Sequence, residues 1–204
     1  MMTVALGDIR IAYYCVPKAG KTTMKSTMKK ISEGGTYVNY GDHPISPLMR
    51  YRSRDHHRIT VVRDPVDRLI SAWSDRIGDR DDIRRSSIST ILCKPLGLNP
   101  SPDLEEFVLN LRKYQMINDR IFRHVIPQIR YIGSDPAFFD AVYSVKDMAR
   151  AQDELSVLVG KDVRIEKLNV SKTNKQAKPV LSQQALEYAR EYYRKDYDLY
   201  GKFF

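Results

Sequence analysis

The sequence has few cysteines and no long apolar run, and both absences narrow what the protein can be. Two cysteines among 204 residues, Cys15 and Cys93, are too few for a disulfide framework, and no further ligands stand at metal-site spacing. No stretch approaches the length of a membrane helix, and the amino terminus lacks the basic-then-apolar layout of a secretion signal. These absences favour a cytoplasmic protein without a membrane span, and a bacterial origin is compatible with them.

Basic residues outnumber acidic ones. The 34 lysines and arginines against 25 aspartates and glutamates give a formal net charge of +9, which suits an anionic ligand. Nucleic acid is the usual partner of a basic protein, but zinc-finger spacing, a basic leucine-zipper pattern and an aromatic RNA-binding signature are all missing from the sequence. We therefore expect no nucleic-acid partner. The length fits one domain, spanning residues 1–204, with a sizeable core.

Strand and helix patterns alternate along the chain. Three apolar runs are each followed by a helical pattern: 9–16 then 21–32, 59–63 then 65–77, and 140–145 then a helix to about residue 159. A fourth strand is expected at 163–168, and a last helix from Ser182. This alternation predicts an α/β fold with a central parallel sheet flanked by helices.

Residues 78–102 interrupt the alternation. They are rich in charge, serine and proline, which predicts a loop-rich insertion. Such a segment is either a lid over a ligand or a solvated connection between elements, and the sequence favours neither.

Residues 16–23, Val-Pro-Lys-Ala-Gly-Lys-Thr-Thr, join the first apolar run to the first predicted helix. A glycine-containing turn at this place directs several backbone N–H groups and the positive end of the helix dipole at one point, which suits a phosphate or a sulfate. Lysines add positive charge there and threonines add hydroxyl donors. We predict that the anion is bound by Lys18, Ala19, Gly20, Lys21, Thr22 and Thr23.

One interpretation of this loop is a Walker A loop, because Gly20-Lys21-Thr22 is the ending of that pattern. The pattern GxxxxGK(S/T) needs a glycine where this sequence has Cys15. A P-loop kinase-like enzyme with a degenerate loop would also need magnesium and an aspartate after an apolar strand. Asp64 is the candidate, but the residues that follow it fit a different pattern better.

A second motif, Arg-Asp-Pro-Val-Asp-Arg-Leu-Ile-Ser-Ala-Trp at 63–73, follows the second apolar run. Asp64 is a good N-cap for the helix that begins there, with proline at the first helical position. Arg63 ends the strand and Ser71 lies about two turns along the helix, so one phosphate could bridge them. Arg68 could lie near the same ligand or pair with a neighbouring carboxylate.

Together the two motifs resemble those of sulfotransferases that use 3′-phosphoadenosine 5′-phosphosulfate (PAPS). Pro17-Lys18-x-Gly20-x-Thr22 resembles the loop that holds the 5′-phosphosulfate, and Arg-Asp-Pro-x-x-Arg-x-x-Ser followed by an aromatic resembles the site of the 3′-phosphate. The resemblance implies a P-loop-like three-layer fold, PAPS as donor co-substrate and no metal. A metal is also not required where a lysine and a helix end already supply positive charge.

Further matches point to a branch of that family. Val16-Pro17-Lys18-x-Gly20-x-Thr22-x-x-Lys25-x-x-Met28, His124-x-x-Pro127-Gln128 and Asp196-Tyr197-x-Leu199-Tyr200-Gly201 are similar to elements of carbohydrate sulfotransferases that modify chondroitin, dermatan and related glycans. This implies a hydroxyl-bearing acceptor, a saccharide, and the positive net charge would suit an anionic one. Two departures are Lys21, where relatives usually carry a small residue, and the missing amino-terminal anchor of the Golgi relatives.

The catalytic candidates are one lysine and two of the four histidines. Lys18 would stabilise the bridging oxygen as it leaves. His43 lies in a turn at a distance before the Arg-Asp-Pro motif similar to that of the catalytic histidine in uronyl 2-O-sulfotransferases, and is our first candidate for the base; a solvent-exposed turn histidine is the alternative. His124 is the second, and could instead position the acceptor or pack. His56 and His57 precede the second strand, at the end away from the donor.

The nucleoside end of the site is assigned by resemblance alone. Ser144, at the end of the third apolar run, and Lys172 should approach the nucleoside or the 3′-phosphate, although turn-forming residues in plain loops would look the same. The sequence thus predicts a PAPS-dependent sulfotransferase. The alternatives are the kinase-like enzyme described above and a non-catalytic anion- or glycan-binding module.

Overall fold

The computed structural model describes residues 1–41, 43–166 and 180–204. These residues divide into two compact units, which are described separately. Unit 1 contains Met1–Arg63, Gln128–Val170 and Lys195–Phe204, and unit 2 contains Asp64–Pro127 and Ser171–Arg194. That the whole chain forms one domain stays a prediction.

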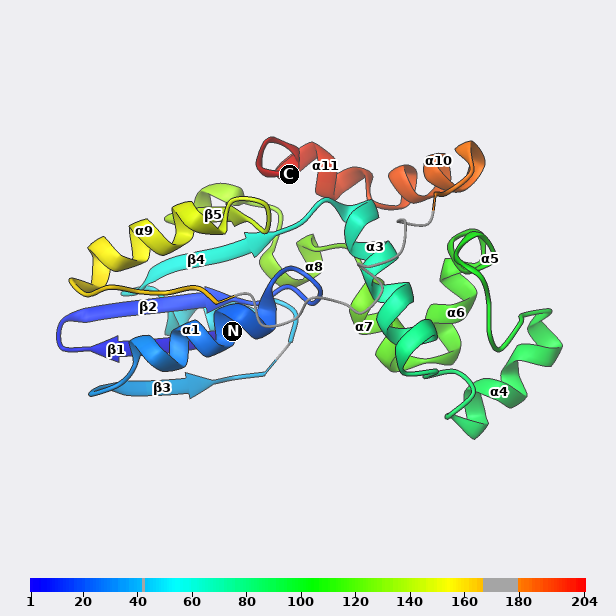
Figure 1. The fold of residues 1–204 in the computed structure, drawn as a ribbon, viewed down its shortest axis with the longest axis horizontal. Helices are drawn as coiled ribbons and strands as arrows, with labels where there is room; N and C mark the ends of the chain where they lie inside the picture. Colours follow the sequence, from blue (N-terminus) through cyan, green and yellow to red (C-terminus); the bar gives the residue numbers. More distant parts are fainter. Residues whose placement is uncertain (42, 167–179) are drawn as a thin grey trace. The chain divides into compact units, whose positions relative to one another are not determined.

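Unit 1 is built on a five-stranded mixed sheet (Figure 1). Its strands in chain order are β1 (Met2–Leu6), β2 (Ile9–Tyr14), β3 (Thr36–Asn39), β4 (His57–Val62) and β5 (Ala141–Ser144). The spatial order is β3-β1-β2-β4-β5, in which β2, β4 and β5 are parallel and β1 is antiparallel to both of its neighbours. The prediction of an α/β fold is confirmed. The prediction of a central parallel sheet holds for β2, β4 and β5, but it missed β1 and β3, which pair in antiparallel fashion.

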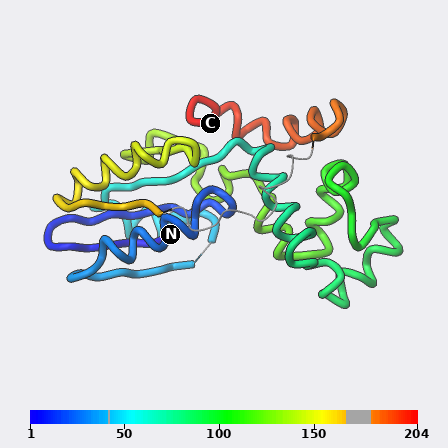
Figure 2. The backbone as a smooth tube through the Cα atoms, in the orientation of Figure 1, coloured from blue at the N-terminus to red at the C-terminus, as the bar shows by residue number. Residues whose placement is uncertain are grey.

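A tight hairpin joins the missed strand β1 to β2, and the reversal is visible in the blue tube of Figure 2. Leu6 pairs with Ile9, so Gly7 and Asp8 alone form the turn, and Gly7 has φ +57°. Turns of this length need a residue that tolerates positive φ, and a Gly-Asp pair is a recognised signal for them. The sequence therefore contained the signal for this hairpin.

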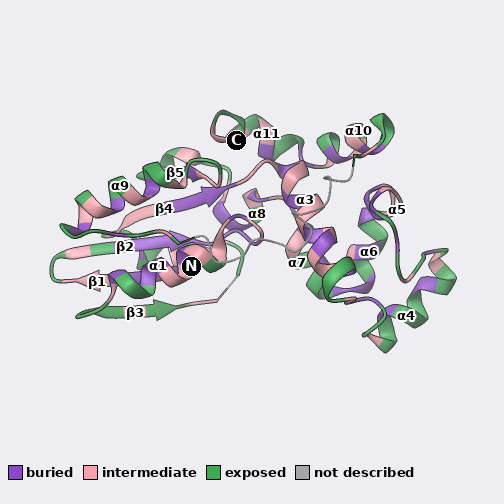
Figure 3. Cartoon of the chain, viewed as in Figure 1, coloured by how far each residue is buried: buried purple, intermediate pink, exposed green. Residues whose placement is uncertain are grey.

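Helices cover both faces of the sheet. On one face, α1 (Lys21–Ile31) and α9 (Met148–Val159) share a core with alternate residues of the strands, such as Tyr13, Val61 and Tyr143. On the other face, the Tyr14 hydroxyl lies 2.7 Å from Ser53 Oγ and donates to the carbonyl of Met49 in α2 (Pro47–Arg52). The carboxyl-terminal halves of β2 and β4 are buried, as the purple in Figure 3 shows.

The remaining elements in the described part of unit 1 lie late in the chain. They are α8 (Ile129–Ile132), the 3-10 helices Pro136–Phe138 and Gly201–Phe203, and α11 (Arg194–Tyr200), whose first residue belongs to unit 2. Of the predicted strand 163–168, residues 163–166 are described and are not a strand, although Val163 packs in the core. Residues 167 and 168 lie outside the described residues.

The described part of unit 2 is helical. It contains α3 (Pro65–Trp73), α4 (Ser87–Cys93), α5 (Leu104–Leu109), α6 (Leu111–Ile117), α7 (Asp119–Val125) and α10 (Gln183–Tyr192). The helix predicted at 65–77 changes its hydrogen-bond spacing after Trp73 and continues as a π-helix, Ser74–Asp79. Residues 78–102 hold α4 and the 3-10 helix Lys94–Leu96 between turns. Among the helices that the structure describes, none combines the length and apolar character needed to cross a bilayer.

Candidate functional site

The predicted anion-binding loop joins β2 to α1 in unit 1. Lys18 and Gly20 both adopt the left-handed conformation, with φ +66° and φ +69°, and Gly20 is the N-cap of α1. Its cap makes no side-chain hydrogen bond, and the fully described first turn of the helix contains no acidic residue. The positive end of the helix dipole is therefore not neutralised by a carboxylate within this turn, as an anion site requires.

Backbone conformation, and not lack of space, explains the glycine in this loop. A Cβ atom at Gly20 would lie 3.7 Å from Val145 Cγ1 and 3.8 Å from Val61 Cγ1, which are ordinary van der Waals distances. A positive φ is costly for residues other than glycine. Because Val61 lies near the end of β4 and Val145 follows β5, the loop sits at the carboxyl edge of the parallel strands, where open α/β sheets bind ligands.

Lys18 also has a positive φ, although it is not a glycine. It is one of two described residues other than glycine with positive φ. A residue of this kind in the left-handed region costs about 1 kcal/mol or more. Backbone strain of this kind clusters at ligand sites, where the surrounding structure enforces it.

Arg63 links the second motif to this loop. It follows β4, and its Nη1 donates to the main-chain carbonyl of Lys18 over 3.3 Å. The two motifs, predicted to bind opposite ends of one donor, are thus joined by a direct hydrogen bond within unit 1.

Asp64 caps the helix that follows, as predicted. Its Oδ1 accepts from the backbone N–H of Asp67 over 2.9 Å, and Pro65 occupies the first turn of α3. This role is typical of an N-cap aspartate. The carboxylate that the kinase-like alternative needs for magnesium is therefore engaged with the protein's own backbone.

Ser71 and Arg68 both lie in α3, within unit 2. Ser71 is half-buried about two turns from the start of the helix, and its approach to a ligand of Arg63 stays a prediction. Arg68 is completely buried, and its guanidinium donates to the main-chain carbonyls of His124, Val125 and Ile126. It also lies over the ring of Tyr193, 5.5 Å from the centroid.

These contacts decide the role of Arg68. The carbonyls that accept from it lie at the carboxyl end of α7, where a positive charge complements the helix dipole. Neither of the sequence-based interpretations, a ligand contact or a pair with a neighbouring carboxylate, describes it. Arg68 is a buried structural residue.

His43 is exposed and follows Gly41, which has φ +79°. A Cβ atom at Gly41 would lie 3.0 Å from His43 Nε2, so the imidazole ring lies close over this glycine. Asp42, a candidate to orient the ring, lies outside the described residues. The catalytic role of His43 stays a prediction.

Both nitrogens of His124 are engaged within unit 2. Nδ1 lies 2.7 Å from the carbonyl oxygen of Arg120, and Nε2 lies 2.7 Å from Nη2 of Arg76. A carbonyl can only accept, so Nδ1 carries the proton and Nε2 accepts from the guanidinium. Arg76 itself is held by Asp82, with 3.2 Å between Nη1 and Oδ2. For His124 to act as a base, an acceptor hydroxyl would first have to displace Arg76.

His56 and His57 lie at the amino end of β4, and Arg63 follows its carboxyl end. Burial, together with the charge of Arg10, lowers the pKa of His56 below its ordinary value. Their place at the end of β4 away from Arg63 agrees with the sequence prediction, which made both poor candidates for the base.

A model of the Sulfotransferase family matches residues 2–203 of this chain. The chain belongs to the sulfotransferase family. The match spans both motifs and the carboxyl-terminal element, and the family predicted from the sequence is confirmed. No curated protein matches the sequence.

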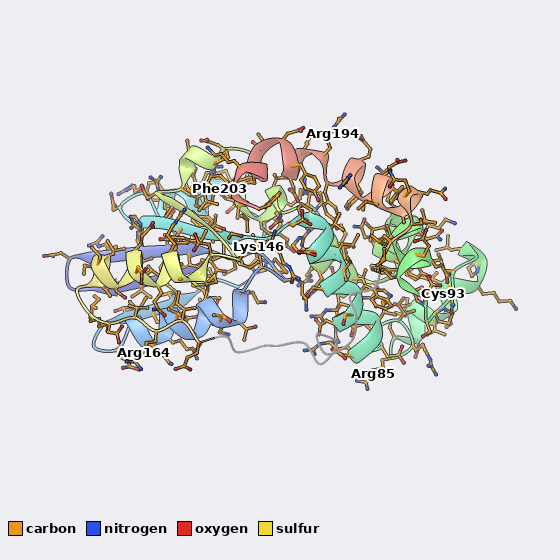
Figure 4. All side chains as sticks on the ribbon, turned by 45° about the horizontal axis from the view of Figure 1, so that its top comes forward. Arg85, Cys93, Lys146, Arg164, Arg194 and Phe203 are labelled. Atoms are coloured by element: carbon orange, nitrogen blue, oxygen red, sulfur yellow. The ribbon has the colours of Figure 1, made fainter. Side chains whose placement is uncertain are left out.

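Two residues of this sulfotransferase-family chain, Ser144 and Lys172, are expected near the nucleoside, and the structure describes the first of them. Ser144 ends β5, and its Oγ accepts from the backbone N–H of Lys146 over 3.2 Å. Lys146 is exposed just beyond the strand and is labelled in Figure 4. Lys172 lies outside the described residues. Both assignments stay predictions.

Gln128, for which the sequence predicted no role, is completely buried beside Arg63. Its Oε1 accepts from the Arg63 N–H over 3.1 Å, and its Nε2 donates to the Arg63 carbonyl over 2.8 Å. Gln128 closes the His-x-x-Pro-Gln element that the sequence analysis had singled out. The motif was therefore the signal in the sequence that could have pointed to Gln128. The contact with Arg63 that explains it joins residues 65 positions apart.

Proposed function

We propose that this sulfotransferase-family protein transfers a sulfuryl group from PAPS to a hydroxyl group of a saccharide. The observation that carries the proposal is the hydrogen bond from Arg63 to the carbonyl of Lys18. This bond joins the strained loop at the start of α1, which carries Lys18, to Arg63, the first residue of the second motif. A sulfuryl donor with charged groups at both ends needs both segments close together. Family membership supports sulfuryl transfer in general.

The anion loop is assigned to the 5′-phosphosulfate within a P-loop-like fold. The backbone from Ala19 to Thr23 and the side chains of Lys21, Thr22 and Thr23 would hold its oxygens. In the reaction, the acceptor oxygen forms a bond to sulfur while the bond from sulfur to the bridging oxygen breaks, and adenosine 3′,5′-bisphosphate leaves. Negative charge develops on that bridging oxygen, and the ammonium group of Lys18 stabilises it.

The second motif is assigned to the 3′-phosphate, which distinguishes PAPS from ATP. Arg63 would bind the phosphate through its guanidinium, a geometry that suits phosphate oxygens, and Ser71 would add a hydroxyl donor. Ser144 and Lys172 are assigned to the nucleoside end by resemblance. The donor would bind without a metal, because loop and lysines supply the positive charge.

His43 is assigned as the base that takes the proton of the acceptor hydroxyl. It is exposed, so an extended saccharide can reach it, whereas both nitrogens of His124 already have partners. His124 is therefore assigned to positioning. The formal net charge of +9 suits an anionic saccharide.

Calorimetric titration with adenosine 3′,5′-bisphosphate, run beside magnesium ATP, tests the donor assignment. We expect binding of the bisphosphate that weakens in Arg63→Ala, followed by sulfate transfer to a saccharide in a radiolabel assay. Binding of magnesium ATP alone would favour the kinase-like enzyme. Binding of the bisphosphate without transfer to any hydroxyl would favour the non-catalytic module.

A further inference from the structure

We propose that Gln128 is a positioning residue for donor binding, and that Asp196 holds it in place. In this proposal, the carboxamide of Gln128 sets the direction in which Arg63 presents its guanidinium to the 3′-phosphate. The inference rests on the proposed function, because it acts through the phosphate contact of Arg63.

The Gln128 carboxamide supplies backbone hydrogen bonds where the pairing of β4 with β5 ends. The last residue pair between β4 and β5 joins Val62 to Ser144, and the Val62 carbonyl accepts from the N–H of Val145 over 3.0 Å. Arg63, one residue further, pairs its N–H and its carbonyl with Gln128 instead, over 3.1 Å and 2.8 Å. An amide side chain offers one acceptor and two donors, so it can satisfy both groups as a neighbouring strand would.

The main chain of Gln128 is itself held in place by Asp196. Asp196 in α11 is completely buried, and its carboxylate oxygens accept from the backbone N–H groups of Gln128 over 2.8 Å and Ile129 over 3.0 Å. Hydrogen bonds to a carboxylate are stronger than those between neutral groups, and a buried site increases their effect. The main chain that carries the carboxamide is thus held by two charge-assisted bonds.

The result is that Arg63 is held at two points. Gln128 fixes its peptide groups, and the carbonyl of Lys18 accepts from its Nη1. Binding a phosphate then requires little further ordering of the arginine, and preorganisation of this kind raises affinity. Loss of the carboxamide should therefore weaken contacts to the 3′-phosphate and leave contacts to the 5′ end unchanged.

The test is Gln128→Met, which keeps the length of the side chain and removes both hydrogen bonds. We expect the affinity for adenosine 3′,5′-bisphosphate, measured by calorimetry, to fall about tenfold. We expect the affinity for adenosine 5′-phosphosulfate, which has no 3′-phosphate, to change less than about twofold. A purely structural role would weaken both ligands equally or neither, and either result would overturn the proposal.

Gln152→Met is the matched control. Gln152 lies in α9 of the same unit, and its Oε1 accepts from the backbone N–H of Ile165 over 3.0 Å, so the same kind of bond is removed elsewhere. We expect unchanged affinity for both ligands. If Gln128→Met does not fold, Gln128→Asn replaces it, because asparagine keeps a neutral carboxamide but is one methylene too short to bond both the N–H and the carbonyl of Arg63. The same selective loss is then expected, and its absence would overturn the proposal.

Arg63→Ala separates this inference from the function on which it rests. If Arg63→Ala weakens the bisphosphate and Gln128→Met does not, the positioning role fails and the donor site stands. If Arg63→Ala leaves the bisphosphate affinity unchanged, the assignment of the 3′-phosphate site fails, and the inference with it. In the double variant we expect no loss beyond that of Arg63→Ala, since Gln128 acts through this arginine.

Discussion

Nη1 of Arg63 donates a hydrogen bond to the main-chain carbonyl of Lys18 over 3.3 Å. The two residues are separated by 45 positions, but they follow β2 and β4, which are parallel neighbours in the sheet. The carboxyl ends of neighbouring parallel strands lie at the same edge, so the topology brings the two motifs together.

Lys18→Ala should reduce turnover and leave donor binding largely intact. Its ammonium group is assigned to charge that develops in the transition state, and loss of one such group typically costs roughly 10²–10³-fold in kcat. Sulfate transfer at saturating PAPS measures the change. Lys29→Ala, at an exposed position in the last turn of α1, is the matched control. Wild-type turnover in Lys18→Ala would refute the assignment.

Lys18→Gly should be more stable than Lys18→Ala. The residue has φ +66°, a conformation that glycine adopts freely and that costs alanine about 1 kcal/mol. The free energy of unfolding in urea, compared between the two variants, measures the difference. At Lys29, within the helix, we expect the opposite order, because glycine there is about 1 kcal/mol less favourable than alanine. The same order at both positions would contradict the strain argument.

Arg68→Leu should destabilise the protein by roughly 3–5 kcal/mol, because it removes the buried guanidinium that donates to three main-chain carbonyls at the end of α7. Chemical denaturation measures the loss. Arg123→Leu on the exposed face of α7 removes an ion pair with Asp119 and should cost less than about 1 kcal/mol. An Arg68→Leu protein of wild-type stability and reduced affinity for the bisphosphate would instead mean that Arg68 binds the donor.

His43→Ala should lower kcat by roughly 10²–10⁴-fold, the usual contribution of a general base. His57→Ala, at the opposite end of β4 from Arg63, is the control and should retain activity. If His124→Ala lowers kcat to this extent and His43→Ala does not, His124 is the base in spite of its contact with Arg76.

The stability of the protein should fall as the pH drops from 7.5 toward 5, in part through His56. Burial, together with Arg10, lowers the pKa of His56, so the folded protein binds this proton more weakly than the unfolded chain. The contribution is fully present above the ordinary pKa of about 6.5 and is lost as pH falls through the folded value. Urea denaturation should show a smaller decline for His56→Gln. An equal decline would show that other groups cause it.

Much of the candidate site could be predicted because its signals are local. The N-cap of α3 by Asp64 and the start of α1 after Gly20 depend on side chains and φ values within a few residues, and both were predicted. The same is true of the two motifs on which the family prediction rested and which the family match spans.

Interactions between distant segments explain what the sequence analysis missed. Strand β3 has four residues, mostly exposed, and it exists because β1 supplies its hydrogen-bond partners. Arg68 was assigned from its place in a motif, but its carbonyl partners lie 56 to 58 residues further along the chain. Short-range patterns carry no information about such partners.

The sequence by itself determined the loop that favours an anion, the helix caps and the family to which the chain belongs. Only the tertiary structure decided that Arg63 contacts the loop at Lys18, and that the carboxamide of Gln128 completes the hydrogen bonds of Arg63. The physical reason is that helix caps and turns satisfy backbone groups from nearby residues. The peptide groups at the end of a parallel strand must instead find partners that the fold brings from far along the chain.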